Sequence, residues 1–198
     1  KIIQGIPTVN VGMPFCLLKL VLNFDCMSPN SLISLLTKNR QQFHPVVLFD
    51  AAKDKLLPLD FTSQNTELSH DILSDTKQFT KWEDEKLKAA DARYGIGGYN
   101  EHRTVYSISK VFDADSPGEE QRRLHLGTDI WGKPYTAVIA PLDGIVHSFA
   151  FNNRFGDYGA TIILSHSLEG SSFYTLYGHL SLNSIKNIQE GDRIEKGD

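Results

Sequence analysis

Short runs of β-branched and aromatic residues recur roughly every ten residues in the C-terminal part of this chain. Turn-forming residues, among them Pro-Leu-Asp-Gly at 141–144, separate the runs. Strand-length runs bounded by turn signals are typical of antiparallel β structure. The pattern therefore predicts a mainly antiparallel β domain with few or no helices. The predicted strands cover residues 135–140, 144–149, 160–165 and 173–178.

The N-terminal half has a different pattern, in which helical spacing of apolar residues alternates with short apolar runs. A capping cluster at 28–31 opens a helical pattern that extends to residue 43, and a second polar, helix-forming stretch covers 65–93. Residues 46–49 form a short apolar run that predicts a strand, with 59–62 pairing back onto it. Together the two halves predict an α+β fold.

An apolar stretch at 11–24 contains Pro14 and Lys19, and it is too short and too interrupted for a membrane-spanning helix, which needs roughly 20 apolar residues. A buried strand or helix is the favoured interpretation. The alternative is the remnant of a secretion signal, although only Lys1 supplies a basic leader and no small-residue cleavage site follows. Because the chain begins with lysine, we expect its true start to be missing or processed.

Three glycines at 95, 97 and 98 end the helical pattern, and we place a domain boundary there. The prediction is a mixed α/β region of unknown role at 1–95 and the β domain at 96–198. Residues 95–103 form either a loop at the rim of a site or a solvated connector. Beyond them, 104–112 predicts a strand and 113–120 an exposed acidic loop.

Composition narrows the classes of function. The chain of 198 residues has a formal charge of −4 and a pI near 6.0, without a stripe of basic residues, which argues against a nucleic-acid partner. No Gly-x-Gly-x-x-Gly follows a strand and no Walker loop is present, so a nucleotide-binding α/β fold is excluded. Cys16 and Cys26 are the two cysteines, and both one disulfide and two buried thiols remain open.

His125 and Asp129 combine an imidazole and a carboxylate at close spacing, a ligand set that suits zinc. Gly127 between them, followed by Thr128, Ile130 and Trp131, indicates a turn that enters a strand. By itself the pair is equally consistent with a surface histidine and a capping aspartate.

Five sequence blocks decide between these interpretations, because their order and spacing match a known pattern. The blocks are His-x-Gly-x-Asp at 125–129, Pro-Leu-Asp-Gly at 141–144, Asp-Tyr-Gly-Ala-Thr-Ile-Ile-Leu-Ser-His at 157–166, Tyr-Gly-His-Leu-Ser at 177–181 and Ile-Gln-Glu-Gly-Asp-Arg-Ile-Glu-Lys-Gly at 188–197. Over about residues 123–198 the chain resembles the lysostaphin/LytM family of zinc endopeptidases.

The resemblance implies that His125 and Asp129 ligate Zn²⁺ and that His179 lies beside the metal as a catalytic base or oxyanion stabiliser. It also implies a peptide substrate, in bacterial peptidoglycan, and a periplasmic or extracellular location. The lack of a clear signal sequence leaves a cytoplasmic location open, and no transmembrane segment is expected. The sequence does not indicate an oligomeric state.

The chain departs from the family pattern in one respect. Family members carry a later His-x-His motif whose second histidine is the third zinc ligand, and no such motif occurs in these 198 residues. Either the chain is a fragment that lacks the segment completing the site, which we favour, or it is an incomplete barrel without peptidase activity. The alternative function is therefore a non-catalytic LytM-like binding or regulatory domain.

The remaining histidines are weaker candidates. We expect His166 to be structural and His147 to lie in the barrel wall, from which it would reach the metal if the third ligand is absent. His102 and Asn100 are candidates for lining the groove. Tyr177 is expected in the core rather than in contact with a reaction intermediate. His44 and His70 are expected to be surface or helix-end residues.

Overall fold

The computed structural model describes residues 15–21, 29–107, 123–154 and 156–198, and for 15–21 it describes the backbone alone. The predicted acidic loop at 113–120 and the thiol of Cys26 lie outside these residues. So do the ends of the apolar stretch at 11–24, whose middle forms strand β1 (Phe15–Val21).

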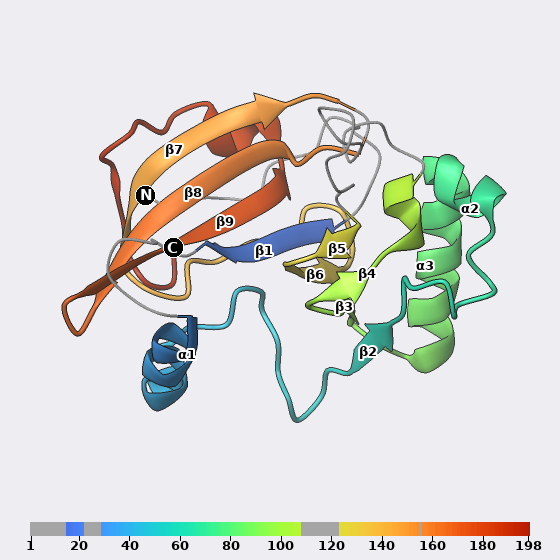
Figure 1. Ribbon diagram of the computed structural model, residues 1–198, viewed down its shortest axis with the longest axis horizontal. Helices are drawn as coiled ribbons and strands as arrows, with labels where there is room; N and C mark the ends of the chain where they lie inside the picture. The colour runs from blue at the N-terminus through green and yellow to red at the C-terminus, as the bar shows by residue number, and fades with distance from the viewer. Residues whose placement is uncertain (1–14, 22–28, 108–122, 155) are drawn as a thin grey trace, which may run out of the picture.

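One large sheet organises the molecule (Figure 1). Its strand order is β10-β7-β8-β9-β1-β6-β3-β2. All neighbours pair antiparallel except β2 and β3, which are parallel. The predicted α+β fold with a mainly antiparallel C-terminal part is confirmed. Besides β1, the strands of this sheet are β2 (Leu56–Leu59), β3 (Tyr94–Gly97), β6 (Thr128–Trp131), β7 (Gly144–Asn152), β8 (Gly159–Leu168), β9 (Ser171–Leu180) and β10 (Arg193–Ile194).

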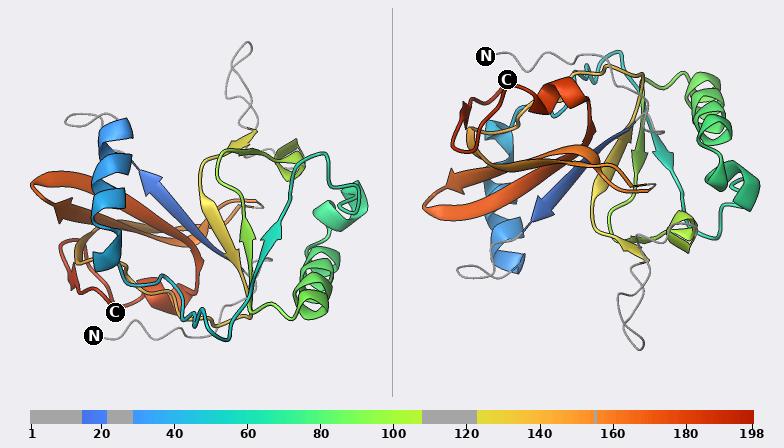
Figure 2. Two further views of the ribbon diagram at one scale, coloured as in Figure 1. Left: turned by 90° about the horizontal axis from the view of Figure 1, so that it is seen from below. Right: turned by 90° about the horizontal axis from the view of Figure 1, so that it is seen from above.

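Shorter elements surround the sheet. Strands β4 (Glu101–His102) and β5 (Leu124–His125) form a separate two-stranded ladder. Figure 2 shows α2 and α3 at the β2 end of the sheet, while α1 lies near the opposite half. The helices are α1 (Pro29–Lys38), η1 (Arg40–Gln42), α2 (His70–Ser74), α3 (Thr76–Ala90), η2 (Thr104–Ser107) and η4 (Leu182–Ile185).

Helix α3 forms where local signals and tertiary packing agree. The side chain of its N-cap residue Asp75 accepts hydrogen bonds from the backbone N–H groups of Lys77 and Gln78. Its C-cap residue Asp91 adopts the left-handed conformation that ends many helices. The helices predicted at 28–43 and 65–93 are confirmed, the latter as α2 and α3.

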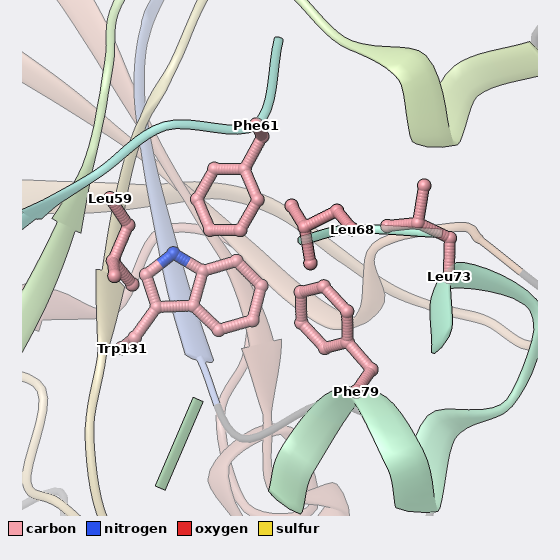
Figure 3. Close-up of a cluster of buried hydrophobic side chains, with 6 residues drawn as sticks. All are labelled: Leu59, Phe61, Leu68, Leu73, Phe79 and Trp131. Carbon is pink, nitrogen blue, oxygen red and sulfur yellow. The ribbon is translucent and has the colours of Figure 1, made fainter. Parts of the chain in front are cut away.

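An aromatic cluster joins α2 and α3 to the sheet. The Trp131 ring, at the end of β6, lies 5.1 Å from the Phe61 ring and 5.2 Å from the Phe79 ring of α3, measured between centroids. Figure 3 shows these rings packed together with three leucines. The helical layer is thereby fixed to β6, the strand that carries Asp129. The buried members are Leu59, Phe61, Leu68, Leu73, Phe79 and Trp131.

A second cluster fills the other half of the sheet. It is formed mainly by alternate residues of β7, β8 and β9, as expected for strands with one face on a core. The predicted strands at 144–149, 160–165 and 173–178 are confirmed as β7, β8 and β9. The cluster consists of Ala140, Val146, Ile162, Leu164, Tyr177 and Ile194.

Two predicted strands do not form. Residues 46–49 and 135–140 lie outside the regular strands. One backbone hydrogen bond joins the two ranges, from Ile139 N to Val46 O at 2.9 Å, and a second joins their neighbours, from His44 N to Pro141 O at 2.9 Å. Pro45 and Pro141 lack the N–H groups that a continuous ladder needs. The strand predicted at 59–62 is also wrong, since residues 60–62 are not in a strand. Leu59 is the last residue of β2, which pairs with β3 and not with 46–49.

The glycine-rich stretch also differs from its prediction. Residues 94–97 form strand β3 rather than a loop, and a Cβ atom at Gly95 would lie 2.5 Å from Leu59 Cδ1. The close approach of β2 thus explains a glycine within a strand. Strands β1, β2 and β3 all join the large sheet, so this sheet contains residues from both sides of the domain boundary predicted between residues 95 and 96. The boundary itself remains a prediction.

The strand predicted at 104–112 is wrong in its first part. Residues 104–107 form the 3₁₀-helix η2, in which Tyr106 N donates to Arg103 O, and Thr104 N donates to Phe61 O. Residues 108–112 lie outside the described part of the chain. Among the described helices, none has the length and hydrophobicity needed to cross a bilayer.

Glu83 lies on the buried face of α3 and is 1% exposed. Neither of its carboxylate oxygens has a hydrogen-bond partner among the described residues. Burial, reinforced by the charge of Asp84, raises the pKa of Glu83 from 4.5 to about 8. The folded protein therefore contains this side chain as an uncharged carboxylic acid at neutral pH.

We predict that this acid makes stability fall as the pH rises. Between pH 4.5 and about 8 the unfolded chain releases the Glu83 proton while the folded chain retains it, so the folded state binds more protons. In Glu83→Gln, the unfolding free energy should fall less steeply over this range. Urea denaturation at a series of pH values measures the slope. Exposed Glu85→Gln is the control, and equal slopes for Glu83→Gln and the parent would contradict the prediction.

Candidate metal centre

Asp129 occupies a central position because of how β6 pairs. It is opposite Gly97 of β3 on one side and Leu17 of β1 on the other. Its side chain is 0% exposed. Placing an ionised carboxylate in such a position requires compensating charges or hydrogen bonds.

Arg103 supplies the compensating charge. Its Nη1 atom donates to Asp129 Oδ2, and its Nε atom donates to Glu101 Oε2 at 2.8 Å. The guanidinium also stacks 5.0 Å from the centroid of the Phe61 ring. Although burial favours the neutral form of Asp129, the adjacent His125 ring and the Arg103 charge outweigh it and hold the pKa of Asp129 below its usual value.

Arg103 is itself buried, with 4% of its surface exposed. Burial alone would lower its pKa, but the charge of Asp129 and the hydrogen bond to it raise the pKa above the ordinary value. Glu101 Oε1 accepts a hydrogen bond from the backbone N–H of Phe61 at 3.0 Å, which fixes the second carboxylate. Two carboxylates therefore face one guanidinium in this buried cluster.

His125 is placed beside Asp129 by the small ladder, in which it is opposite Glu101. The ring is 6% exposed and its Nδ1 atom is hydrogen-bonded to the hydroxyl group of Tyr106. Its other nitrogen, Nε2, lies 3.3 Å from Asp129 Oδ1. The predicted pair is thus brought together in space.

The two facing atoms of this pair lack hydrogen-bond partners. His125 Nε2 and Asp129 Oδ1 are both buried and lie 3.3 Å apart. Neither atom has a hydrogen-bond partner among the described residues. Two ligands of one tetrahedral zinc ion, each at about 2.0–2.2 Å, lie roughly 3.4 Å apart. The donor atoms, their separation and their lack of other partners therefore fit a zinc ion.

The pair is incomplete as a metal site. No group of three or more His, Cys, Asp or Glu side chains suited to a metal ion occurs among residues 29–107, 123–154 and 156–198. Structural and catalytic zinc sites use at least three protein ligands. These two side chains supply part of such a set.

His179 lies near the end of β9, on the other side of β1 from Asp129. Leu17 of β1 is opposite Asp129 in β6 and opposite Gly178 in β9, so one row across the sheet leads from Asp129 to the residue before His179. Two strand spacings of about 4.8 Å separate the backbones in that row. Burial lowers the pKa of His179 to about 4, against the opposing charges of Asp129 and Asp157.

The backbone of His179 is unusual. Its φ angle is 56°, in the left-handed region that few non-glycine residues adopt, and its N–H donates to Tyr158 O at 2.7 Å. Gly159 lies beside His179 and has a φ of 61°. A Cβ atom at Gly159 would lie 3.7 Å from His179 Cα. Strained conformations of this kind persist where the surrounding structure holds them, often at functional sites.

The other histidines separate into buried and exposed groups. His166 is buried and fully engaged: Nδ1 contacts Asp143 O at 2.8 Å and Nε2 contacts Thr175 Oγ1 at 2.7 Å. Tyr177, predicted as core, is buried and hydrogen-bonds with the same Thr175 hydroxyl at 2.9 Å. His147, His102 and Asn100 are exposed.

Sequence reasoning missed Arg103 and Tyr106. The sequence predicts either a loop at the rim of a site or a solvated connector at 95–103, and it does not indicate the pairing of Arg103 with Asp129. Tyr106 was placed in a strand. The available signal was the cluster of charged residues at 101–103 directly behind three glycines.

Comparisons with known proteins agree with the predicted resemblance. Residues 123–198 match the sequence model of Peptidase family M23. A protein of Haemophilus influenzae described as an uncharacterized metalloprotease is 29% identical over 126 residues, which cover 54% of this chain and 25% of that protein. No solved structure matches. The resemblance to LytM-type peptidases is confirmed, and metallopeptidase activity is the function that these matches support.

The approach of Arg103 to Asp129 depends on the absence of a side chain at residue 97, which leads to a prediction. A Cβ atom at Gly97 would lie 2.8 Å from Arg103 Nη2 and 3.2 Å from Phe61 Cε2. Gly97→Ala should therefore lower the free energy of unfolding by about 1–3 kcal/mol, as overpacking does. The matched control is Gly98→Ala, whose new Cβ would meet nothing closer than 3.7 Å. Denaturant unfolding of both variants checks this, and equal losses would contradict it.

Proposed function

We propose that this protein is a zinc-dependent metalloendopeptidase that cuts peptide bonds in bacterial cell-wall peptidoglycan. The observation that carries the proposal is the pair of buried atoms His125 Nε2 and Asp129 Oδ1, which face each other at 3.3 Å and have no hydrogen-bond partner among the described residues, within the segment that matches a peptidase family. Such buried polar atoms are costly unless something binds them.

In this proposal His125 and Asp129 hold the ion through Nε2 and Oδ1. A bound zinc ion lowers the pKa of a coordinated water to about 7 and polarises the carbonyl group of the scissile bond. A third ligand is needed, and the family pattern places it in a His-x-His motif that does not occur within residues 1–198.

His179 is proposed to orient the nucleophilic water and to accept its proton. An uncharged imidazole is suited to this role, and a positioned base of this kind contributes typically 10²–10⁴-fold to the rate. The row across the sheet that leads from Asp129 through Leu17 to Gly178, the residue before His179, supports its placement beside the same centre.

The choice of peptidoglycan as substrate rests on the family resemblance. This substrate implies a location outside the cytoplasmic membrane. The alternative, a non-catalytic binding domain, is less well supported, because His125 and Asp129 are both retained and their outer atoms are held by Tyr106 and Arg103.

The metal assignment predicts about one zinc ion per chain in the full-length protein. His125→Ala and Asp129→Asn should each lose most of the metal, the second without removing the side chain that Arg103 contacts. Exposed His147→Ala is the control and should keep it. Metal analysis after removal of loosely bound ions measures the content. A parent protein without zinc, or unchanged metal in His125→Ala, would overturn the assignment.

The role of His179 predicts a variant that binds metal but does not cleave. His179→Asn is suitable because asparagine tolerates the left-handed backbone that His179 adopts. Cleavage of peptidoglycan peptides should fall by about 10²–10⁴-fold while the zinc content stays at the parent level. Cleavage at the parent rate would show that His179 has no part in the chemistry.

A further inference from the structure

Both proposed ligands are held in place by residues outside the segment that matches the peptidase family. The match begins at residue 123, whereas Arg103 and Tyr106 belong to the segment 101–107 that precedes it. Arg103 contacts Oδ2 of Asp129, and Tyr106 contacts Nδ1 of His125. These are the ligand atoms that do not face the other ligand.

The contact of Tyr106 selects the nitrogen that His125 presents. A histidine that binds a metal through Nε2 carries its proton on Nδ1, and that proton needs an acceptor. The Tyr106 hydroxyl is bonded to Nδ1 and provides the acceptor oxygen.

The contact of Arg103 selects the oxygen that Asp129 presents. The guanidinium occupies Oδ2, so Oδ1 is the oxygen that stays unpartnered beside His125 Nε2. The guanidinium is fixed in turn by Glu101 and by the Phe61 ring. Because Glu101 adds a second negative charge, Asp129 is not simply neutralised by Arg103.

The segment 101–107 is fastened to the site at several points. Glu101 pairs with His125 across the small ladder, and Arg103 N donates to Arg123 O at 3.0 Å. Arg123 Nη1 donates back to Tyr106 O, and Thr104 N donates to Phe61 O at 3.3 Å. The backbone that carries both contacts is therefore ordered by bonds on either side of them.

We propose that Arg103 and Tyr106 are positioning residues for the metal, so that its affinity depends on the segment 101–107 as well as on the family-matched segment. This inference rests on the proposed function, since it requires that His125 and Asp129 bind zinc. Outer partners of metal ligands typically contribute 10–100-fold to metal affinity. A guanidinium that competed with the cation for Asp129 would have the opposite effect on affinity.

The test is the zinc affinity of the full-length protein, measured by competition with a chelator, together with the visible absorption of the Co²⁺-substituted protein. Tyr106→Phe removes only the hydroxyl oxygen, and Arg103→Met removes the guanidinium while keeping the length of the side chain. Each should weaken zinc binding about 10–100-fold. Arg103→Lys keeps the charge without the two-armed contact and should lie between Arg103→Met and the parent.

Two matched controls separate positioning from general stability. Tyr94→Phe also loses a tyrosine hydrogen bond, from its hydroxyl to Leu48 O at 3.1 Å, and Arg93→Met also loses a pairing with an aspartate, Asp54 at 2.6 Å. Neither residue contacts His125 or Asp129 in the described contacts, so both variants should bind zinc as the parent does. Metal-free unfolding curves show whether each variant is folded, and if Arg103→Met is not, Tyr106→Phe decides the test.

The outcomes distinguish this inference from the proposed function. If the parent binds no zinc, the proposed function fails and the inference fails with it. If the parent binds zinc and Tyr106→Phe and Arg103→Lys bind it equally tightly, with unchanged Co²⁺ absorption, only the inference is overturned. Tighter binding by Arg103→Met would show that Arg103 competes with the metal, which also overturns it.

Discussion

The buried ion pair between Arg103 and Asp129 is the interaction on which the site depends. Removing two charges from water costs several kcal/mol per ion, and the pair alone does not reliably recover that cost. Here Glu101 and the Phe61 ring add further contacts to the guanidinium. The resulting group of two carboxylates and one guanidinium has a net negative charge in a region closed to water. The proposed divalent cation at Asp129 Oδ1 and His125 Nε2 would reverse the sign of that charge.

The large sheet brings the parts of this pair together from distant positions in the chain. β6 carries Asp129, and its neighbours β1 and β3 come from residues far earlier in the sequence. Trp131, two positions beyond Asp129 and therefore on the same face of the strand, packs against Phe61 and Phe79. The aromatic cluster therefore includes Trp131 of the strand that carries Asp129, and it includes the Phe61 ring that contacts Arg103. Packing in the helical layer and geometry at the candidate centre are consequently parts of one structure.

Local sequence signals were sufficient for some of this arrangement. Alternation and turn residues predicted β7, β8 and β9, whereas the grouping of His125, Asp129 and His179 is what the resemblance to a peptidase family implies. The failures arose where pairing partners are remote. Nothing local indicates that β1 lies between β9 and β6, or that glycines at 95 and 97 stand in a strand because neighbours approach closely. The Arg103 and Tyr106 contacts depend on the same long-range pairing, and β propensity at 104–107 was overridden by bonds to Phe61 and Arg103.

Preorganisation is the physical effect that the segment 101–107 would have on the proposed ligand pair. A histidine and an aspartate that rotate freely must lose side-chain entropy when an ion binds, and that loss reduces the affinity. In this structure the loss has occurred on folding, because Tyr106 fixes the ring of His125 and Arg103 fixes the carboxylate of Asp129. For the proposed zinc site, the stability of the fold would therefore supply part of the binding free energy. It follows that changes in the aromatic cluster beneath Arg103 would act on metal affinity and on stability together, whereas the Tyr106 hydroxyl group acts mainly on the first.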